Sequence, residues 1–156
     1  MIAWVGLVAR LVVGGVWLVA GALKVTHPED SVRAVAAFRL LPDVVETPVG
    51  YGLPVLEVCT GLLLVLGLTT RFAAVISALL LTAFIIGIAS AWARGLRIEC
   101  GCFGGGGQTS ADVGRAYALD LARDLGLLLL SFLVAWRPIT RLSTDAAIYS
   151  RGALTQ

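Results

Sequence analysis

The stretch FAAVISALLLTAFIIGIASAWA, residues 72–93, decides the fold class of this sequence. It holds no Asp, Glu, Lys, Arg or His, so none of its side chains carries a full charge. About 20 apolar residues suffice to cross the hydrocarbon core of a bilayer as a helix. The apolar residues run on continuously and do not alternate with polar ones, which is typical of a helix. The stretch therefore predicts a transmembrane helix.

Three further apolar runs accompany it in the sequence, at residues 2–24, 51–68 and 115–136. The chain has 156 residues, of which 58% are hydrophobic and 14% are charged, and its mean hydropathy is +0.92. Soluble domains carry roughly 25% charged residues, so the polar side chains here are too few to cover a soluble core. Because only helices and closed barrels satisfy their backbone in lipid, the four runs predict an all-α, four-helix transmembrane bundle.

A longer connection follows the first run, at residues 25–50. Within it, PEDSVRAVAAFRLL, residues 28–41, has a proline and acidic residues at its start and predicts a short helix that Pro42 ends. We expect this helix to lie at the membrane interface. The side chains expected to face lipid or the bundle are those of Phe38, Leu40 and Leu41.

The other connections are a tight turn at residues 69–71 and a loop with two cysteines at residues 94–114. Four spans put the two long loops on one side of the membrane and both termini on the other. The first run lacks a basic start and contains Arg10, so we expect it to be retained and not cleaved as a signal peptide. One membrane domain is predicted over residues 1–141, followed by a short polar tail over residues 142–156.

The basic residues do not decide which side faces the cytoplasm. Those on the side of the termini are Arg71, Arg137, Arg141 and Arg151. Those on the side of the long loops are Lys24, Arg33, Arg39, Arg94, Arg97 and Arg115. Basic residues favour the cytoplasmic side, and the count does not favour the termini. Disulfide exchange is useful in oxidising compartments, and on that ground we expect a plasma-membrane protein with cytoplasmic termini and an extracytoplasmic cysteine loop.

Cys100 and Cys102 are the strongest candidates for chemistry, in the segment RIECGCFGGGGQTS, residues 97–110. A Cys-Gly-Cys pair can close a small, strained disulfide, and strained disulfides are the labile, catalytic or regulatory ones. The glycines that follow let the loop meet a partner. We interpret both cysteines as catalytic in thiol–disulfide exchange. The alternatives are a structural disulfide, free thiols, or a site for a soft metal such as Cu(I).

Other residues carry weaker signals. Cys59 lies inside an apolar run and is predicted to be a small buried residue, with a third redox thiol as the alternative. His27 precedes Pro28 and is interpreted as a loop residue; a single histidine excludes a multi-histidine metal or haem site. The glycines at 104–107 lack the Lys-Ser/Thr of a phosphate loop. No metal cofactor is expected.

Ionisable residues also lie within the apolar runs, namely Arg10, Glu57, Asp120, Arg123 and Asp124. Each costs roughly 2.5–3.5 kcal/mol at the centre of a membrane helix, so we expect these side chains to face the bundle and to pair. The depths of Arg10, Glu57 and Asp124 overlap, which predicts one cluster. The cluster is either a structural ion-pair network or the polar floor of a quinone site or proton path. The candidate quinone-binding residues are Arg10, Glu57, Arg123 and Asp124.

Over residues 7–136 the sequence resembles the DoxX-like small membrane proteins. The stretches that carry the resemblance are GALKVTHPED and LPDVVETPVGYGLPVLEVCTGLLLVLGLTTR, with the motif residues Arg10, Gly21, Lys24, Pro42, Pro54, Glu57, Gly61, Gly67 and Arg71. CGCFG at 100–104 and RDLGLLLL at 123–130 are similar to the MauE branch. The resemblance implies a four-helix membrane redox protein, and for that branch a link to disulfide formation in methylamine dehydrogenase.

These observations lead to one functional hypothesis and two alternatives. The hypothesis is a quinone-linked thiol–disulfide oxidoreductase that connects an extracytoplasmic partner, through Cys100 and Cys102, to a membrane quinone. The partner would be a thioredoxin-like protein or a protein whose disulfides it helps to form. The alternatives are a non-enzymatic assembly subunit with a structural loop disulfide and a soft-metal carrier. The bilayer is an expected partner, nucleic acid is not, and association into a homo-oligomer is left open.

Overall fold

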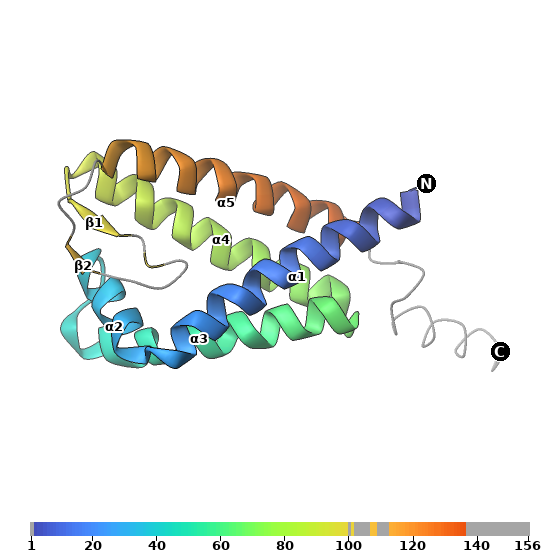
Figure 1. Cartoon of the computed structure of the whole chain (residues 1–156), viewed down its shortest axis with the longest axis horizontal. Helices are drawn as coiled ribbons and strands as arrows, with labels where there is room; N and C mark the ends of the chain where they lie inside the picture. Colours follow the sequence, from blue (N-terminus) through green and yellow to red (C-terminus); the bar gives the residue numbers. More distant parts are fainter. Residues whose placement is uncertain (1, 100, 102–106, 109–112, 137–156) are drawn as a thin grey trace.

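The computed structural model describes residues 2–99, 101, 107–108 and 113–136, and these residues form helices and one short hairpin, joined by turns and short connections (Figure 1). The helices are α1 (Ile2–Thr26), α2 (Pro28–Ala37), α3 (Asp43–Leu66), α4 (Thr70–Ala93) and α5 (Val113–Trp136). The strands β1 (Ile98–Glu99) and β2 (Gly107–Gln108) pair antiparallel. The expected helical fold class is confirmed. Cys100, Cys102 and the predicted polar tail, residues 142–156, lie outside the described residues.

Within the described part of the chain, three helices are long and apolar enough to cross a membrane, over Trp4–Thr26, Asp43–Leu66 and Thr70–Ala93. They indicate a multi-pass membrane protein. Helix α5 is as long as α4, with 24 residues each, but it carries two Arg and two Asp residues. These four charged residues distinguish the composition of α5 from that of the three candidate spans.

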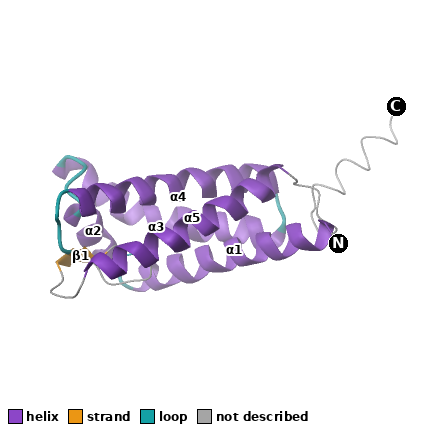
Figure 2. Ribbon diagram, turned by 90° about the horizontal axis from the view of Figure 1, so that it is seen from above, coloured by secondary structure: helices purple, strands orange, loops and turns teal. Residues whose placement is uncertain are grey.

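The four long helices lie side by side along one axis (Figures 1 and 2). Helix α1 packs mainly against α3, and α4 packs mainly against α5. Gly67 adopts a left-handed conformation, with φ 72°, and its N–H donates to the last carbonyls of α3, which allows the turn into α4. The start of α1 and the end of α5 lie at one end of the bundle, and α2 and the hairpin lie at the other (Figure 1).

The connection between α1 and α3 differs from the sequence prediction. Helix α2 begins at Pro28 as predicted but ends at Ala37, several residues before Pro42. Residues 43–50, predicted to be loop, are the first two turns of α3. Pro42 is the cap residue of α3, acidic side chains occupy its first turn, and the helix continues through Pro48 and Pro54. The prediction located this helix by its apolar run at residues 51–68, and the more polar turns before that run gave no such signal.

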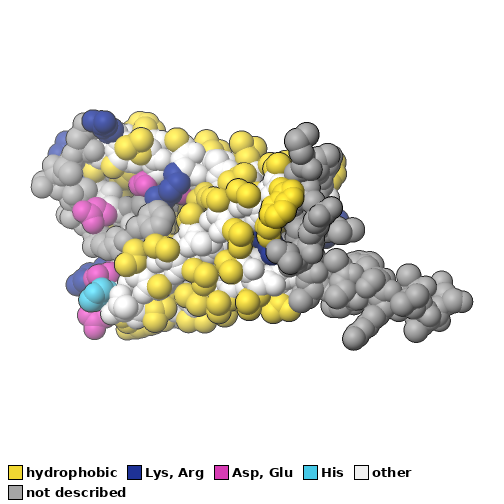
Figure 3. Space-filling view, turned by 45° about the vertical axis from the view of Figure 1, so that its right-hand side comes forward, with side chains coloured by type: hydrophobic (Ala, Val, Ile, Leu, Met, Phe, Trp, Pro, Cys, Tyr) yellow, Lys and Arg dark blue, Asp and Glu magenta, His cyan; other side chains and the backbone are white. Residues whose placement is uncertain are grey.

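Several polar side chains lie inside the bundle beside its apolar core, and many large apolar side chains lie on its outer surface. The buried polar or charged residues include Arg10, Lys24, Glu57, Ser77, Asp124 and Ser131. The exposed apolar residues include Val55, Leu79, Ile86, Leu129 and Phe132. Figure 3 shows hydrophobic side chains over the long helices, with most charged side chains of that face near the end that carries α2 and the hairpin. This distribution is the one expected of a bundle surrounded by lipid.

Small residues bring α1 and α3 close together. A Cβ atom added to Gly61 would lie 2.9 Å from the carbonyl oxygen of Gly14, and one added to Gly21 would lie 2.6 Å from the side chain of Val58. Helices in membranes associate through such contacts because lipid gives no hydrophobic drive between them. The contact fixes the rotation of α1 against α3, and with it the side chains that face each other.

Candidate functional site

The cysteine loop is closed at its base by the two-stranded ladder. Ile98 pairs with Gln108, and Glu99 pairs with Gly107, so residues 100–106 connect two paired positions. Cys100 and Cys102, the predicted catalytic residues, both belong to this segment, outside the described residues. The ladder therefore fixes where the segment leaves and rejoins the fold.

Tyr117 of α5 anchors the chain that leads into this loop. Its hydroxyl donates to the carbonyl oxygen of Leu96 at 2.9 Å and accepts from the backbone N–H of Ile98 at 3.1 Å. The side chain is buried and its ring lies against that of Trp92. The sequence analysis missed Tyr117, because a tyrosine near the start of an apolar helix gives no signal of contacts 19 and 21 positions earlier.

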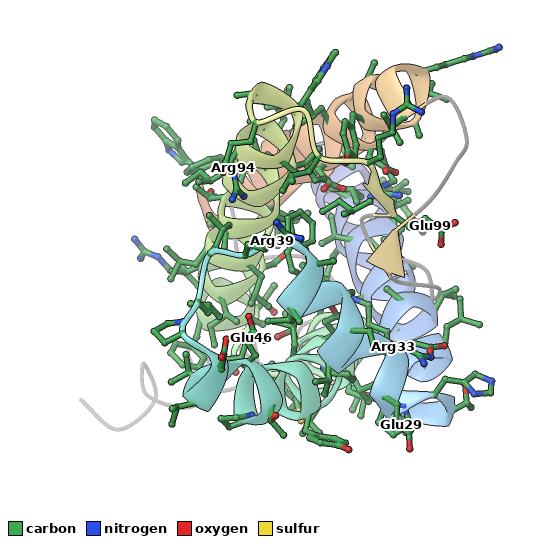
Figure 4. The ribbon with its side chains drawn as sticks, turned by 90° about the vertical axis from the view of Figure 1, so that its left-hand side faces the viewer. Glu29, Arg33, Arg39, Glu46, Arg94 and Glu99 are labelled. Atoms are coloured by element: carbon green, nitrogen blue, oxygen red, sulfur yellow. The ribbon has the colours of Figure 1, made fainter. Side chains whose placement is uncertain are left out.

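Arg94 holds α2 against the end of α4. Its guanidinium donates to the carbonyl oxygen of Phe38 at 2.5 Å and to that of Arg39 at 3.4 Å, at the end of α2. Figure 4 looks onto this end of the molecule and shows Arg94 beside Arg39, with Glu99 on the hairpin and Arg33 on α2. The contacts position α2 beneath the cysteine hairpin.

A largely apolar cavity of about 240 Å³ lies under the cysteine loop. Its wall is formed by side chains of α2, α3 and α4, by the chain between α2 and α3, and by Gly101. Gly101 is buried, adopts a left-handed conformation with φ 68°, and is bonded covalently to both cysteines. Two polar residues, Lys24 and Ser31, contribute to the same wall. The cavity thus connects the Cys-Gly-Cys motif with the charged interior of the bundle.

Glu57 forms a buried ion pair with Lys24. Lys24 Nζ lies 2.5 Å from Glu57 Oε1, and the side chains are 5% and 0% exposed. The ammonium also lies 5.3 Å from the ring centre of Phe84. Both charges are shielded from lipid by pairing inside the bundle, as expected of ionisable groups at this depth.

The predicted cluster of Arg10 with Glu57 and Asp124 is wrong, because Lys24 is the partner of Glu57. Arg10 is buried, with 2% exposure, but it lies about 21 Å from Lys24 along the axis of α1, at 1.5 Å per residue. Lys24 was visible in the sequence as part of the G-x-x-K motif. Its place near the end of an apolar run led to its assignment as an interfacial charge, and the contact with α3 buries it instead.

On α5, Arg123 pairs with both Asp120 and Asp124, in line with the expectation that the ionisable residues of the apolar runs pair. Its guanidinium lies 3.0 Å from Asp120 and 2.9 Å from Asp124. A second cavity, of about 20 Å³, is lined by Glu57, Arg123 and Asp124 together with Trp17 and Phe84. That volume suffices for about one water molecule.

The oxygens Glu57 Oε2 and Asp124 Oδ2 are buried, and neither has a hydrogen-bond partner among the described residues. They belong to residues that line the same small cavity. The structure therefore brings Glu57 and Asp124 together, as predicted, although Arg10 is not the residue that joins them.

A chain of hydrogen bonds links three helices at the centre of the bundle. Trp17 Nε1 donates to Ser77 Oγ at 2.7 Å, and Ser77 Oγ and Ser131 Oγ lie 2.9 Å apart. Ser131 Oγ donates to the carbonyl oxygen of Leu127 at 2.9 Å, which makes Ser77 the donor to Ser131. The chain ties α1 to α4 and α5, and polar residues inside a membrane bundle commonly act in this way.

Two weaker predictions have clear outcomes. Cys59 is exposed on the side of α3, so its prediction as a buried residue is wrong. It lies about 24 Å along α3 from Asp43, on the outer surface of the bundle. His27 is exposed in the turn before α2, as predicted. Among the described residues no group of three or more His, Cys, Asp or Glu side chains is placed to hold a metal ion.

Comparison with known proteins adds one family. The family model described as methylamine utilisation protein MauE matches residues 2–137. A methylamine utilization protein MauE of Paracoccus denitrificans is 34% identical over 107 residues, which cover 68% of this chain and 56% of that protein. Its namesake in Methylorubrum extorquens is 36% identical over 114 residues, which cover 72% of this chain and 59% of that protein. The chain thus matches less than two thirds of the length of these relatives. No solved structure gives a significant match.

Proposed function

This chain belongs to the MauE family, and from that premise we propose that it is a thiol–disulfide redox protein of methylamine utilisation. It exchanges a disulfide with an extracytoplasmic partner through Cys100 and Cys102, and it passes the electrons to a membrane quinone. The partner is a thioredoxin-like protein or a protein that needs disulfides to mature. The relation to DoxX-like proteins is part of the proposal, supported by the burial of Arg10, Gly21, Lys24, Glu57 and Gly61, which carry that resemblance.

One observation carries the proposal: Gly101, bonded to both cysteines, forms part of the wall of an apolar cavity inside a membrane protein. A static loop disulfide needs no such cavity, and a soft-metal site needs thiolates more than apolar walls. An apolar cavity next to a pair of cysteines suits a lipid-soluble electron acceptor.

In the proposed reaction, a thiolate of the partner attacks one sulfur of the Cys100–Cys102 disulfide and forms a mixed disulfide. The second thiol of the partner resolves it, so the partner is oxidised and both cysteines of this chain are reduced. Reoxidation of the two thiols forms the S–S bond and releases two electrons and two protons. A bound quinone supplies the matching chemistry, since it accepts two electrons and two protons and becomes a hydroquinone. The chain itself positions the thiols, keeps the cavity apolar, and holds the Lys24–Glu57 charges in its wall.

The proposal includes a topology. We place α5 as the fourth span, because it runs the length of the bundle beside α4 (Figures 1 and 2) and its residue Asp124 is buried in the interior. The cysteine loop then lies outside the plasma membrane, and the termini are cytoplasmic. An impermeant maleimide applied to intact cells should label a single cysteine at position 102 and not one placed at position 151. The reverse pattern would invert the topology.

The test of function uses the purified protein in lipid nanodiscs without oxygen. After reduction, one equivalent of a short-chain quinone should convert both loop thiols to a disulfide, measured by the mass added on alkylation. Cys100→Ser and Cys102→Ser should abolish this conversion, and one of them should trap the partner as a mixed disulfide in cells. One equivalent of tightly bound thiophilic metal, with no quinone-dependent oxidation, would support the metal carrier and contradict the redox proposal. Loop thiols that are not oxidised by quinone and bind no metal would contradict the redox proposal and support the non-enzymatic assembly subunit.

A further inference from the structure

We infer that the 240 Å³ cavity under the cysteine loop binds the quinone ring, with Ser31 Oγ and Lys24 Nζ as hydrogen-bond donors to its carbonyl oxygens. The inference rests on the proposed function for the identity of the ligand, whereas the cavity and its two donors stand independently of it. Sequence reasoning had assigned the quinone to Arg10, Glu57, Arg123 and Asp124.

Volume distinguishes the two cavities. The small cavity beside Glu57, Arg123 and Asp124 measures about 20 Å³, which holds no ring. A dry cavity of about 150 Å³ accommodates benzene. The larger cavity, at about 240 Å³, therefore has room for one substituted six-membered ring. Its wall includes the aromatic rings of Phe38 and Phe84, which suit a flat ligand.

Ser31 is the first of the two donors. It lies on α2, is 4% exposed, and its Oγ has no hydrogen-bond partner among the described residues. A buried hydroxyl without a partner is unfavourable, so this position in the cavity wall favours a ligand that carries an acceptor. A hydrocarbon chain would leave the hydroxyl unsatisfied, whereas a carbonyl oxygen would satisfy it.

Lys24 is the second donor. Its ammonium has three N–H groups, and Glu57 Oε1 is its single hydrogen-bond acceptor among the described residues. The ion pair fixes the ammonium near the ring of Phe84, which also lines the cavity. An N–H that remains can therefore donate to a ligand oxygen without breaking the pair with Glu57.

The position of the cavity fits a ligand that arrives from the membrane. Leu40, Leu41 and Val49 line the cavity and are also 50%, 38% and 37% exposed on the apolar surface of the bundle. Its deepest residues on α3 and α4, Leu53 and Ala83, each lie about 15 Å from the helix end nearest the loop, which is within one leaflet. A lipid-soluble quinone can reach this mouth directly and meets Gly101 inside.

The experiment measures binding of decylubiquinone and menadione to the protein in nanodiscs, by quenching of tryptophan fluorescence. Trp17 serves as reporter because its ring lies 6.0 Å from that of Phe84. We expect Ser31→Ala to weaken binding about 3- to 10-fold, the usual effect of one lost hydrogen bond. Gly87→Leu should remove saturable binding, because a Cβ at Gly87 lies 3.6 Å from the ring of Phe38 and a longer side chain extends into the cavity.

The matched control is Gly126→Leu on α5, where nothing lies within 4 Å of an added Cβ. It should bind quinone as the wild type does, and thermal unfolding should show that all three variants are folded. Unchanged binding in folded Ser31→Ala and Gly87→Leu would overturn the inference and leave thiol oxidation by quinone standing. Binding that these variants weaken, without any quinone-dependent oxidation of the loop thiols, would keep the site and contradict the proposed function. A wild-type protein that retains a lipid acyl chain in the cavity and binds no quinone would also overturn the inference that the cavity binds quinone.

Discussion

The strongest test of the charged interior is removal of one charge from the Lys24–Glu57 pair. Lys24→Met deletes the ammonium and keeps most of the side-chain length. The carboxylate of Glu57, 0% exposed, then lies inside the bundle without its partner at 2.5 Å. Isolated buried charges are strongly unfavourable in an interior that water does not reach.

The expected loss in the free energy of unfolding is about 3–5 kcal/mol, the range found when one partner of a buried ion pair is removed. For a chain of this length, each kcal/mol lowers the melting temperature by about 2–4 °C, so the variant should melt about 6–20 °C lower. The double variant Lys24→Met, Glu57→Leu removes both charges and should recover most of the loss, because apolar replacements of a buried pair are often neutral.

Thermal unfolding in one detergent, followed by circular dichroism, measures all three proteins. The control is the pair of Asp30 and Arg33 on α2, whose arginine side chain is 64% exposed. Arg33→Met should cost at most about 1 kcal/mol, since exposed ion pairs are weak. A Lys24→Met protein that melts with the wild type, or a double variant as unstable as the single one, would refute the burial and pairing of these charges.

The position of Cys59, the hydrogen bonds of Tyr117 and the close contact of α1 with α3 each give one further prediction. Cys59→Ala should leave the rate of thiol exchange with the partner within about twofold of the wild type, because Cys59 lies on the outer surface of α3 and a thiolate must be accessible to react. Loss of exchange in a folded variant would instead show that Cys59 relays electrons. Tyr117→Phe should lower the free energy of unfolding by about 1–3 kcal/mol and slow thiol exchange, because two backbone groups at the base of the cysteine loop lose their hydrogen-bond partner. An unchanged exchange rate would show that Tyr117 does not position the loop. Gly61→Leu should lower the free energy of unfolding by about 1–3 kcal/mol, since its Cβ would lie 2.9 Å from the backbone of α1. The control Gly15→Leu, whose Cβ has nothing within 4 Å, should unfold as the wild type does.

Some of the candidate site could be predicted because its signals are local. Asp120 and Arg123 lie three positions apart on one helix, and their pairing follows from helical spacing alone. The helical class follows from the length and continuity of the apolar runs. Local signals also misled: residues 43–50 were predicted to be loop, yet they form the first two turns of α3.

The burial of Cys59 was mispredicted for a related reason. A cysteine in an apolar run has no charge that would force it inward, and in lipid an apolar residue is stable on either face of a helix. Only the contact of α3 with α1, made by Gly61 and Gly14, decides which face turns outward. Both glycines are visible in the sequence, but their positions along the chain do not show which helices they bring into contact.

By itself, the sequence determined that this chain forms apolar helices, that ionisable side chains within them must face the interior, and that two cysteines lie in a loop between the last two long helices. Those properties depend on hydrophobicity, length and covalent order, which are local. Only the tertiary structure decided that Lys24 pairs with Glu57, that Tyr117 anchors the loop, and that Gly101 lines a cavity with Ser31. Each of these contacts joins residues 19 to 70 positions apart, and each depends on the rotation and depth at which close-packed helices meet.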